Sequence, residues 1–178
     1  QDASGAAKWD PIELGLRHRD AYFAASPEPH GEDEWHPEAS DRSDYKIEIT
    51  ADVDELRDVG RDEDAKRLYR VATSQDAVLS VVKEQWLAEA GKQNTKQTIG
   101  NHKQALGLLT EAHPTLVFAG DITPRKASEF VTGTLAKGRS TKTANKLLSS
   151  LSSFWKWMIR RGLTEVNPWL GKGFAKAK

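Results

Sequence analysis

The sequence predicts a mainly α-helical protein, in which a compact four-helix bundle follows a variable and partly irregular N-terminal segment. Two observations carry this prediction. From residue 76 onward, apolar residues recur at the i, i+3, i+4, i+7 spacing of amphipathic helices, and caps or glycines separate the helical segments. The first 75 residues lack such a rhythm. We therefore expect an acidic segment over 1–75, partly helical or disordered, and a bundle over 76–170.

Local patterns in the N-terminal segment are weak. Residues 10–25 contain a proline near a possible helix start, and three apolar residues fall loosely on one face: Ile12, Leu16 and Phe23. Residues 26–43 are dense in Pro, Glu, Asp and Ser, a composition typical of a loop or a disordered linker.

The rest of this segment is highly charged. Residues 45–50 alternate apolar and polar side chains, which favours a short strand. Residues 52–73 offer only a thin apolar stripe, and Gly60 is expected to divide them into two short helices.

The first two helices of the bundle are expected over 77–90 and 95–112. Gly91 is expected to end the first of them. Asn94 followed by Gln97 resembles a capping box that begins the second.

The last two helices have stronger boundary signals. Thr123-Pro124 places an N-cap before a proline at the first helical position, and this third helix stops near Gly138. Ser140 caps the longest helix, which runs to about Arg161. Its buried face is marked by Leu147, Leu148, Leu151, Phe154, Trp155, Met158 and Ile159.

Charge is divided unevenly between the two halves, although the formal net charge is zero. Residues 1–75 hold 19 acidic and 10 basic residues, a balance of −9, whereas residues 76–178 hold 7 and 16, a balance of +9. Such asymmetry is typical of a basic nucleic-acid module joined to an acidic segment. Two ordinary surfaces that happen to differ are the alternative.

The composition also excludes several classes of protein. No apolar run approaches the roughly 20 residues that span a bilayer, and no basic-then-apolar leader is present. The absence of cysteine excludes disulfides and thiolate chemistry. We expect a cytoplasmic, nucleoid-associated protein.

Several motifs of the second half occur in a characteristic order: Asn94–Thr98, Phe118–Thr123, Gly138–Asn145, Phe154–Trp157 and Gly162–Pro168. The last three are the most specific, because they combine a glycine turn before a Thr/Asn-rich helix start, an aromatic pair, and Gly-x-x-x-x-Asn-Pro. This ordered set resembles the core-binding, SAM-like domain of tyrosine recombinases, the phage-integrase family. The resemblance covers about residues 76–170.

The resemblance implies a domain that closes around duplex DNA together with a following catalytic domain. That catalytic domain supplies arginines, a lysine, a His-x-x-Arg element and a tyrosine nucleophile. No His here is followed by Arg three residues later, and the only tyrosines, Tyr22, Tyr45 and Tyr69, precede the core-binding region. We therefore expect no catalytic residues and no cofactor, and we interpret the chain as a fragment of a longer integrase, with residues 171–178 beginning a linker.

Candidate DNA contacts gather at two helix starts. Helix N-termini present free N–H groups and a partial positive charge, which suit phosphate, and nearby Lys, Arg and hydroxyl groups add donors. In the recombinase family the equivalent helices lie across the major groove. The resemblance thus nominates Lys96, Thr98, Lys103, Arg139, Thr141, Lys142, Thr143 and Lys146, and Asn145 joins this set of candidate contacts by its own chemistry. Helix capping and solvated lysines are the simpler interpretation of the same residues.

Three further features have competing interpretations. Asn145 could pair with adenine, but a local hydrogen bond in the first helical turn is preferred. Helical spacing places most aromatic residues in the core, and Trp157 is expected to be the most exposed of them. His30 and His36 flank three carboxylates, yet their spacing matches no known metal site, so no metal is expected.

The expected function is positioning of duplex DNA at a recombination core site. Other recombinase protomers are expected as partners in the full-length enzyme. A helical protein–protein adaptor without DNA affinity is the main alternative, and an enzyme with a metal at His30 and His36 is the second. The DNA sequence and the direction of recombination are left open.

Overall fold

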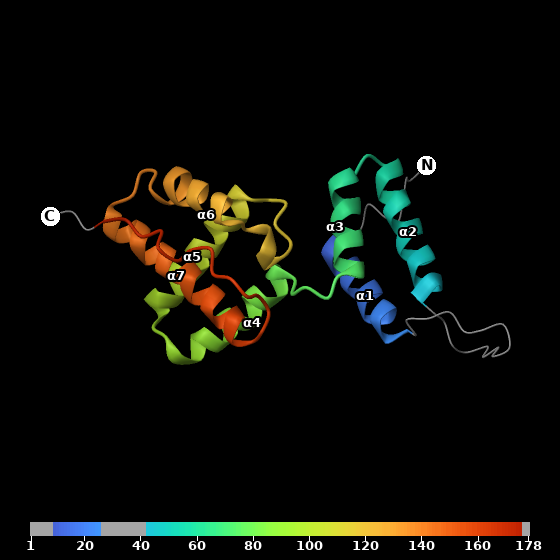
Figure 1. The fold of residues 1–178 in the computed structure, drawn as a ribbon, viewed down its shortest axis with the longest axis horizontal. Helices are drawn as coiled ribbons and strands as arrows, with labels where there is room; N and C mark the ends of the chain where they lie inside the picture. Colours follow the sequence, from blue (N-terminus) through green and yellow to red (C-terminus); the bar gives the residue numbers. More distant parts are fainter. Residues whose placement is uncertain (1–8, 26–41, 176–178) are drawn as a thin grey trace. The chain divides into compact units, whose positions relative to one another are not determined.

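The computed structural model describes residues 9–25 and 42–175, and the all-helical fold predicted from the sequence is confirmed there. The chain divides into two compact units, residues 1–76 and 77–178 (Figure 1). The α-helices of the described residues are α1 (Pro11–Ala24), α2 (Arg42–Asp58), α3 (Asp62–Thr73), α4 (Leu79–Gln93), α5 (Lys96–Ala112), α6 (Pro124–Phe130) and α7 (Thr141–Arg160). The predicted linker over 26–41 and the His30–His36 segment lie outside the described residues.

The first unit is a bundle of α1, α2 and α3, in which α3 packs against both other helices. Its core consists of Ile49, Val53, Leu56, Ala65, Leu68 and Ala72. Helix α1 approaches α3 closely at Gly15, where an added Cβ would lie 2.8 Å from Val71 Cβ and 2.9 Å from the Leu68 carbonyl oxygen. Glycine at this position is what permits the two helices to touch.

Two expectations for this unit were wrong. The predicted strand over 45–50 is part of helix α2. The alternation of Tyr45, Ile47 and Ile49 does not reflect a buried strand face, because Ile47 is 69% exposed. Ile49 instead begins the buried stripe of α2, which continues at the helical spacing i+4 and i+7. Helix α1 exists as expected, but the residues that pack on the core are Leu14 and Tyr22, not the Ile12, Leu16 and Phe23 stripe.

Gly60 does separate two helices, and its φ of 76° suits glycine.

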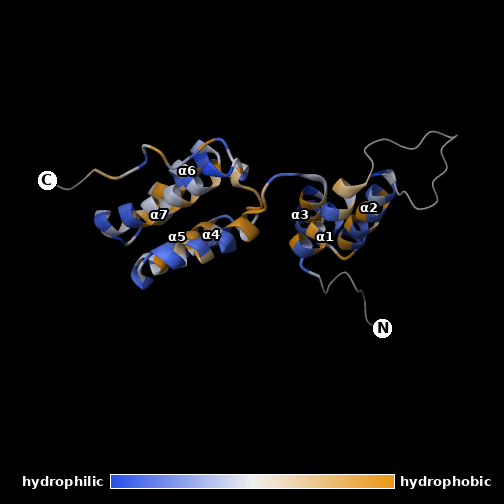
Figure 2. Cartoon of the chain, turned by 90° about the horizontal axis from the view of Figure 1, so that it is seen from below, coloured by the Kyte–Doolittle hydropathy of each residue, from blue (hydrophilic) through white to orange (hydrophobic). Residues whose placement is uncertain are grey.

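The second unit is a larger bundle in which α5 and α7 pack together and α4 contacts both. Its core contains Leu151, Phe154, Trp155, Met158 and Trp169, all almost completely buried. Hydrophilic residues dominate the end of this unit at which α7 begins (Figure 2). Val78 and Phe118 form an isolated bridge, which is the only β-type pairing in the described part of the chain.

The helix boundaries confirm some caps and correct others. Thr123 accepts from the Lys126 amide and Ser140 from the Thr143 amide, as predicted for the third and fourth helices of the bundle. Gly91 does not end α4, which continues to Gln93. Asn94 caps that helix end through a bond from its Nδ2 to the Ala90 carbonyl, so the expected capping box before α5 was wrong.

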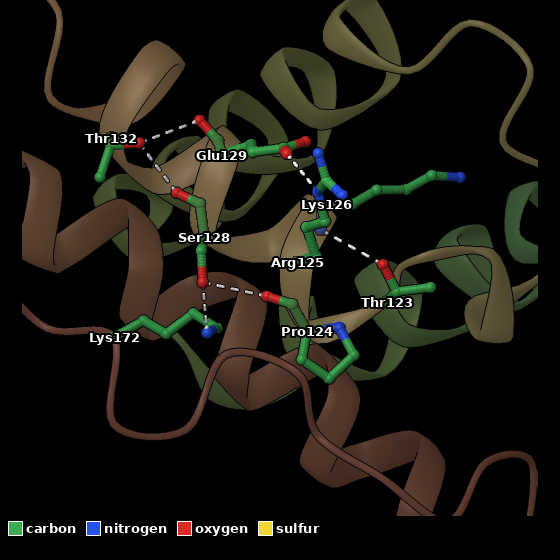
Figure 3. A network of polar contacts seen from close by, with 8 residues as sticks. All are labelled: Thr123, Pro124, Arg125, Lys126, Ser128, Glu129, Thr132 and Lys172. Atoms are coloured by element: carbon green, nitrogen blue, oxygen red, sulfur yellow. Dashed lines mark hydrogen bonds and ion pairs between the residues drawn. The ribbon is translucent and has the colours of Figure 1, made fainter.

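A π-helical turn, η3 (Val131–Leu135), follows α6 directly. Contacts around α6 include Arg125 with Glu129 and Lys172 with Ser128, the latter joining α6 to the segment after α7 (Figure 3). No helix in the described residues is long and apolar enough to cross a membrane.

Candidate nucleic-acid interface

A groove lies between the first turns of α5 and α7. Its first hollow has a volume of about 1130 Å³ and is lined by Gln97, Thr98, Asn101, His102, Ser140, Thr141, Lys142, Asn145, Lys146, Ser149, Ser150 and Ser153. Hydroxyl, amide and ammonium groups dominate this lining, and no carboxylate is among these described residues. A wall that offers donors and positive charge without acid is suited to a polyanion.

The two helix starts that bound the groove are built alike. Thr95 accepts from the Thr98 amide at 3.3 Å, and Ser140 accepts from the Thr143 amide at 3.3 Å. The paired hydroxyls, Thr95 with Thr98 and Ser140 with Thr143, are each 3.0 Å apart. Each cap satisfies only one of the free amides of its first turn, so partial positive charge remains at both ends.

Helix α7 contains no acidic residue along its 20 positions. Its outward polar residues follow helical spacing from the first turn to the last: Lys142, Lys146, Ser149, Ser153, Lys156 and Arg160. All six are exposed. The helix therefore presents a continuous basic and hydroxyl stripe, which we call the α7 polar stripe.

The groove continues along this stripe into a second hollow of about 530 Å³. Thr98, His102 and Ser153 line both hollows, and Lys156, Arg160 and Arg161 line the second. The sequence did not lead us to nominate five of these lining residues as DNA contacts: Ser149, Ser153, Lys156, Arg160 and His102. The signal was present, because the spacing of three and four residues that starts at Lys142 continues to Arg160.

The structure brings some of the nominated residues together in the groove. Those that line it are Thr98, Thr141, Lys142, Asn145 and Lys146. Lys96, Lys103 and Thr143 are exposed on the same two helices but do not line the hollow. Whether any of them contacts DNA stays a prediction.

Arg139 has a defined structural contact. Its guanidinium Nη1 donates to the Thr134 carbonyl at 2.8 Å and to the Lys137 carbonyl at 3.2 Å. These bonds hold the turn between η3 and α7, in which Gly138 has a φ of 68°. Arg139 thereby positions the start of α7.

Asn145 holds the segment that follows α7. Its Nδ2 donates to the Phe174 carbonyl at 3.0 Å, and its Oδ1 accepts from the Phe174 amide at 2.9 Å. The chain runs back along α7 to reach this point (Figure 1), and Asn167 fixes the start of that return by donating to Ser152. The preferred local bond in the first turn was therefore wrong, since the partner lies 29 residues away.

The expected exposure of Trp157 was also wrong, because this side chain is buried. Its Nε1 donates to Glu89 of α4 at 2.9 Å, and Arg161 both stacks on the ring and pairs with Glu89. The bond from Trp157 and the charge of Arg161 lower the pKa of Glu89. Glu89 is the one carboxylate in the lining of the second hollow, and it is neutralised by Arg161.

Comparison with known proteins identifies part of this unit. Residues 84–162 match the family model described as phage integrase, N-terminal SAM-like domain. The match includes α5, α6 and α7 and most of α4. It therefore contains every residue that lines the two hollows. Searches of curated proteins and of solved structures found no match.

Proposed function

We propose that the chain binds duplex DNA and positions it at a recombination core site, on the premise that residues 84–162 match the N-terminal SAM-like domain of phage integrases. The observation that carries the proposal is the α7 polar stripe beside the groove. The stripe places lysines and a row of hydroxyls on an acid-free helix, and the groove beside it also includes the start of α5.

Phosphate contacts supply the affinity in this proposal. Lys142, Lys146 and Lys156 neutralise phosphates and release counterions, which favours binding at low salt. Ser140, Thr141 and the free first-turn amides donate neutral hydrogen bonds that fix the register of the duplex. Positioning therefore comes from many modest contacts and not from one strong site.

The remaining nominated residues act around this face. Lys96 and Lys103 on α5 and Thr143 on α7 extend the contact surface outward from the groove, where all three are exposed. Arg139 contributes mainly by holding the turn before α7. The proposal assigns no strand cleavage to these residues, and neighbouring recombinase protomers are proposed as the protein partners.

The test is fluorescence anisotropy of the full chain with labelled duplex DNA at several salt concentrations. We expect log K to fall linearly with log salt, with a slope of about −0.9 for each neutralised phosphate. Replacing both Lys142 and Lys146 by Gln should weaken binding and make the slope shallower by about 2.

A matched control removes the same charge elsewhere in the unit. Arg125→Gln with Lys126→Gln changes two exposed cations of α6 that line neither hollow. This pair should leave both affinity and slope nearly unchanged. Equal losses in the two double variants would mean that net charge alone drives binding, and no binding at low salt would favour the adaptor alternative.

A further inference from the structure

His102 lies where the two hollows of the groove meet. It comes from α5, one turn after Thr98, and lines both hollows although only 9% of its surface is exposed. Its ring stacks on Trp86, with ring centroids 4.5 Å apart and planes tilted by 36°. The ring is thus fixed by packing while one edge remains in the groove.

The two ring nitrogens have different surroundings. Nδ1 is enclosed and has no hydrogen-bond partner among the described residues, whereas Nε2 is not enclosed in this way. A buried N–H without an acceptor is costly, so the proton of the neutral ring belongs on the accessible nitrogen. Nε2–H is therefore a donor that faces the groove.

Packing alone does not explain a histidine here. A phenyl ring would stack on Trp86 equally well and would leave no unpaired nitrogen inside the unit. A polar ring with one nitrogen buried and the other accessible is instead what a fixed, directed donor requires.

We propose that His102 donates a hydrogen bond from Nε2 to a phosphate oxygen of duplex DNA lying in the groove. This inference rests on the proposed function and adds a contact that lies between the two groups of cations. A phosphate is favoured over a base edge because cations flank His102 on both sides: Lys142 and Lys146 in the first hollow, Lys156, Arg160 and Arg161 in the second.

The same contact links DNA binding to pH. Burial lowers the pKa of His102 below its ordinary 6.5, so the free ring is neutral at pH 7. The charged side chains that share the two hollows with His102 are Lys142, Lys146, Lys156, Arg160, Arg161 and Glu89, and Glu89 is already paired with Arg161. A bound phosphate favours the imidazolium and raises the pKa of His102 above that of the free ring, so affinity should rise as pH falls through the pKa of the bound state and level off below that of the free state. The rise is at most tenfold per pH unit for one proton.

Two variants of the full chain separate the donor from the ring. His102→Phe keeps the stacking on Trp86 and loses the donor, and should weaken duplex binding about two- to tenfold at pH 7.5. His102→Gln keeps a neutral donor and should bind within about twofold of the original chain. Both should lose the part of the pH dependence that His102 contributes, and thermal melting followed by circular dichroism checks the fold.

The outcomes are distinguishable. Wild-type affinity and pH profile in His102→Phe would overturn the inference and leave the proposed function standing. Sequence-dependent losses without a pH effect would identify a base edge as the acceptor and also overturn the phosphate assignment. Absence of DNA binding by the original chain would instead remove the proposed function itself.

Discussion

The first unit and helix α7 of the second unit use the same charged residue types in different ways. In the first unit, several cations are paired with carboxylates three or four residues away along the chain: Arg17 with Glu13, Arg57 with Asp54, Lys66 with Glu63, and Arg61 and Arg67 with Asp64. On α7 no carboxylate is available at such a distance. Neutrality of the whole chain therefore hides a basic face, because the pairing is local to each helix.

This contrast explains why cation number is a poor guide to binding. Exposed pairs at i, i+3 or i, i+4 stabilise a helix by only about 0.2–0.5 kcal/mol each, but they also cancel the field that would attract a polyanion. Lys142, Lys146 and Lys156 form no ion pair within the described residues. Their field remains available to a partner.

The largest expected effect tests whether the two units are independent. Trp155 is fully buried in the second unit, and Trp155→Ala should lower the free energy of unfolding of that unit by about 3–5 kcal/mol. Leu68→Ala in the first unit should cost about 2–5 kcal/mol there. Hydrogen exchange measured for each unit reports both losses.

DNA binding should follow the second unit in this pair of variants. Trp155→Ala is expected to weaken it strongly, while Leu68→Ala should leave it nearly unchanged. A comparable loss of binding in Leu68→Ala would show that the first unit participates in recognition. It would contradict the assignment of DNA binding to the second unit alone.

The next effect concerns paired and unpaired cations. Lys156→Glu with Arg160→Glu on the α7 polar stripe should weaken duplex binding about 10- to 100-fold near 0.1 M salt, because phosphate contacts are replaced by repulsion. Arg57→Glu with Lys66→Glu makes the same change of charge in the first unit and should weaken binding far less. Anisotropy titrations of both double variants, with salt dependence, decide the matter.

Two helical glycines give opposite expectations. Gly15→Ala in α1 should destabilise the first unit by about 1–3 kcal/mol, because the new Cβ meets Val71 at 2.8 Å. Gly91→Ala in α4 meets nothing within 4 Å and should stabilise the second unit by up to about 1 kcal/mol. Denaturant unfolding measures both, and stabilisation by Gly15→Ala would contradict the close approach of α1 and α3.

The smallest effect concerns Asn145. Asn145→Ala removes both bonds to Phe174, one of which holds the Phe174 amide, so exchange of that amide should accelerate about tenfold, as for the loss of one net hydrogen bond. DNA affinity should change by less than about threefold, since the Asn145 amide already has intramolecular partners. A large, sequence-dependent loss of affinity would instead restore the interpretation of Asn145 as a base contact.

The sequence predicted the second unit better than the first for a physical reason. Long amphipathic helices with strong caps, such as Ser140 before α7, contain their boundary signals within a few residues. Helix α2 has a weak apolar stripe, and the alternation of residues 45–50 matched a strand equally well until packing against α1 and α3 selected Ile49.

The candidate site was predicted in part. The helix starts and Lys142 and Lys146 follow from local composition, and helical spacing alone extends that set along α7 to Arg160. His102 required the structure, because only its position against Trp86 and between two hollows distinguishes it from any other helical histidine.

The sequence by itself determined the helical class, the caps at Thr123 and Ser140, and the uneven charge, because each depends on residues close together in the chain. Tertiary structure decided which distant residues three side chains or backbone positions contact. Asn145 bonds to Phe174, 29 residues away, Trp157 bonds to Glu89, 68 residues away, and Gly15 lies against Val71, 56 residues away. Such contacts depend on how helices pack, and a one-dimensional pattern does not specify which distant residue fills a given place.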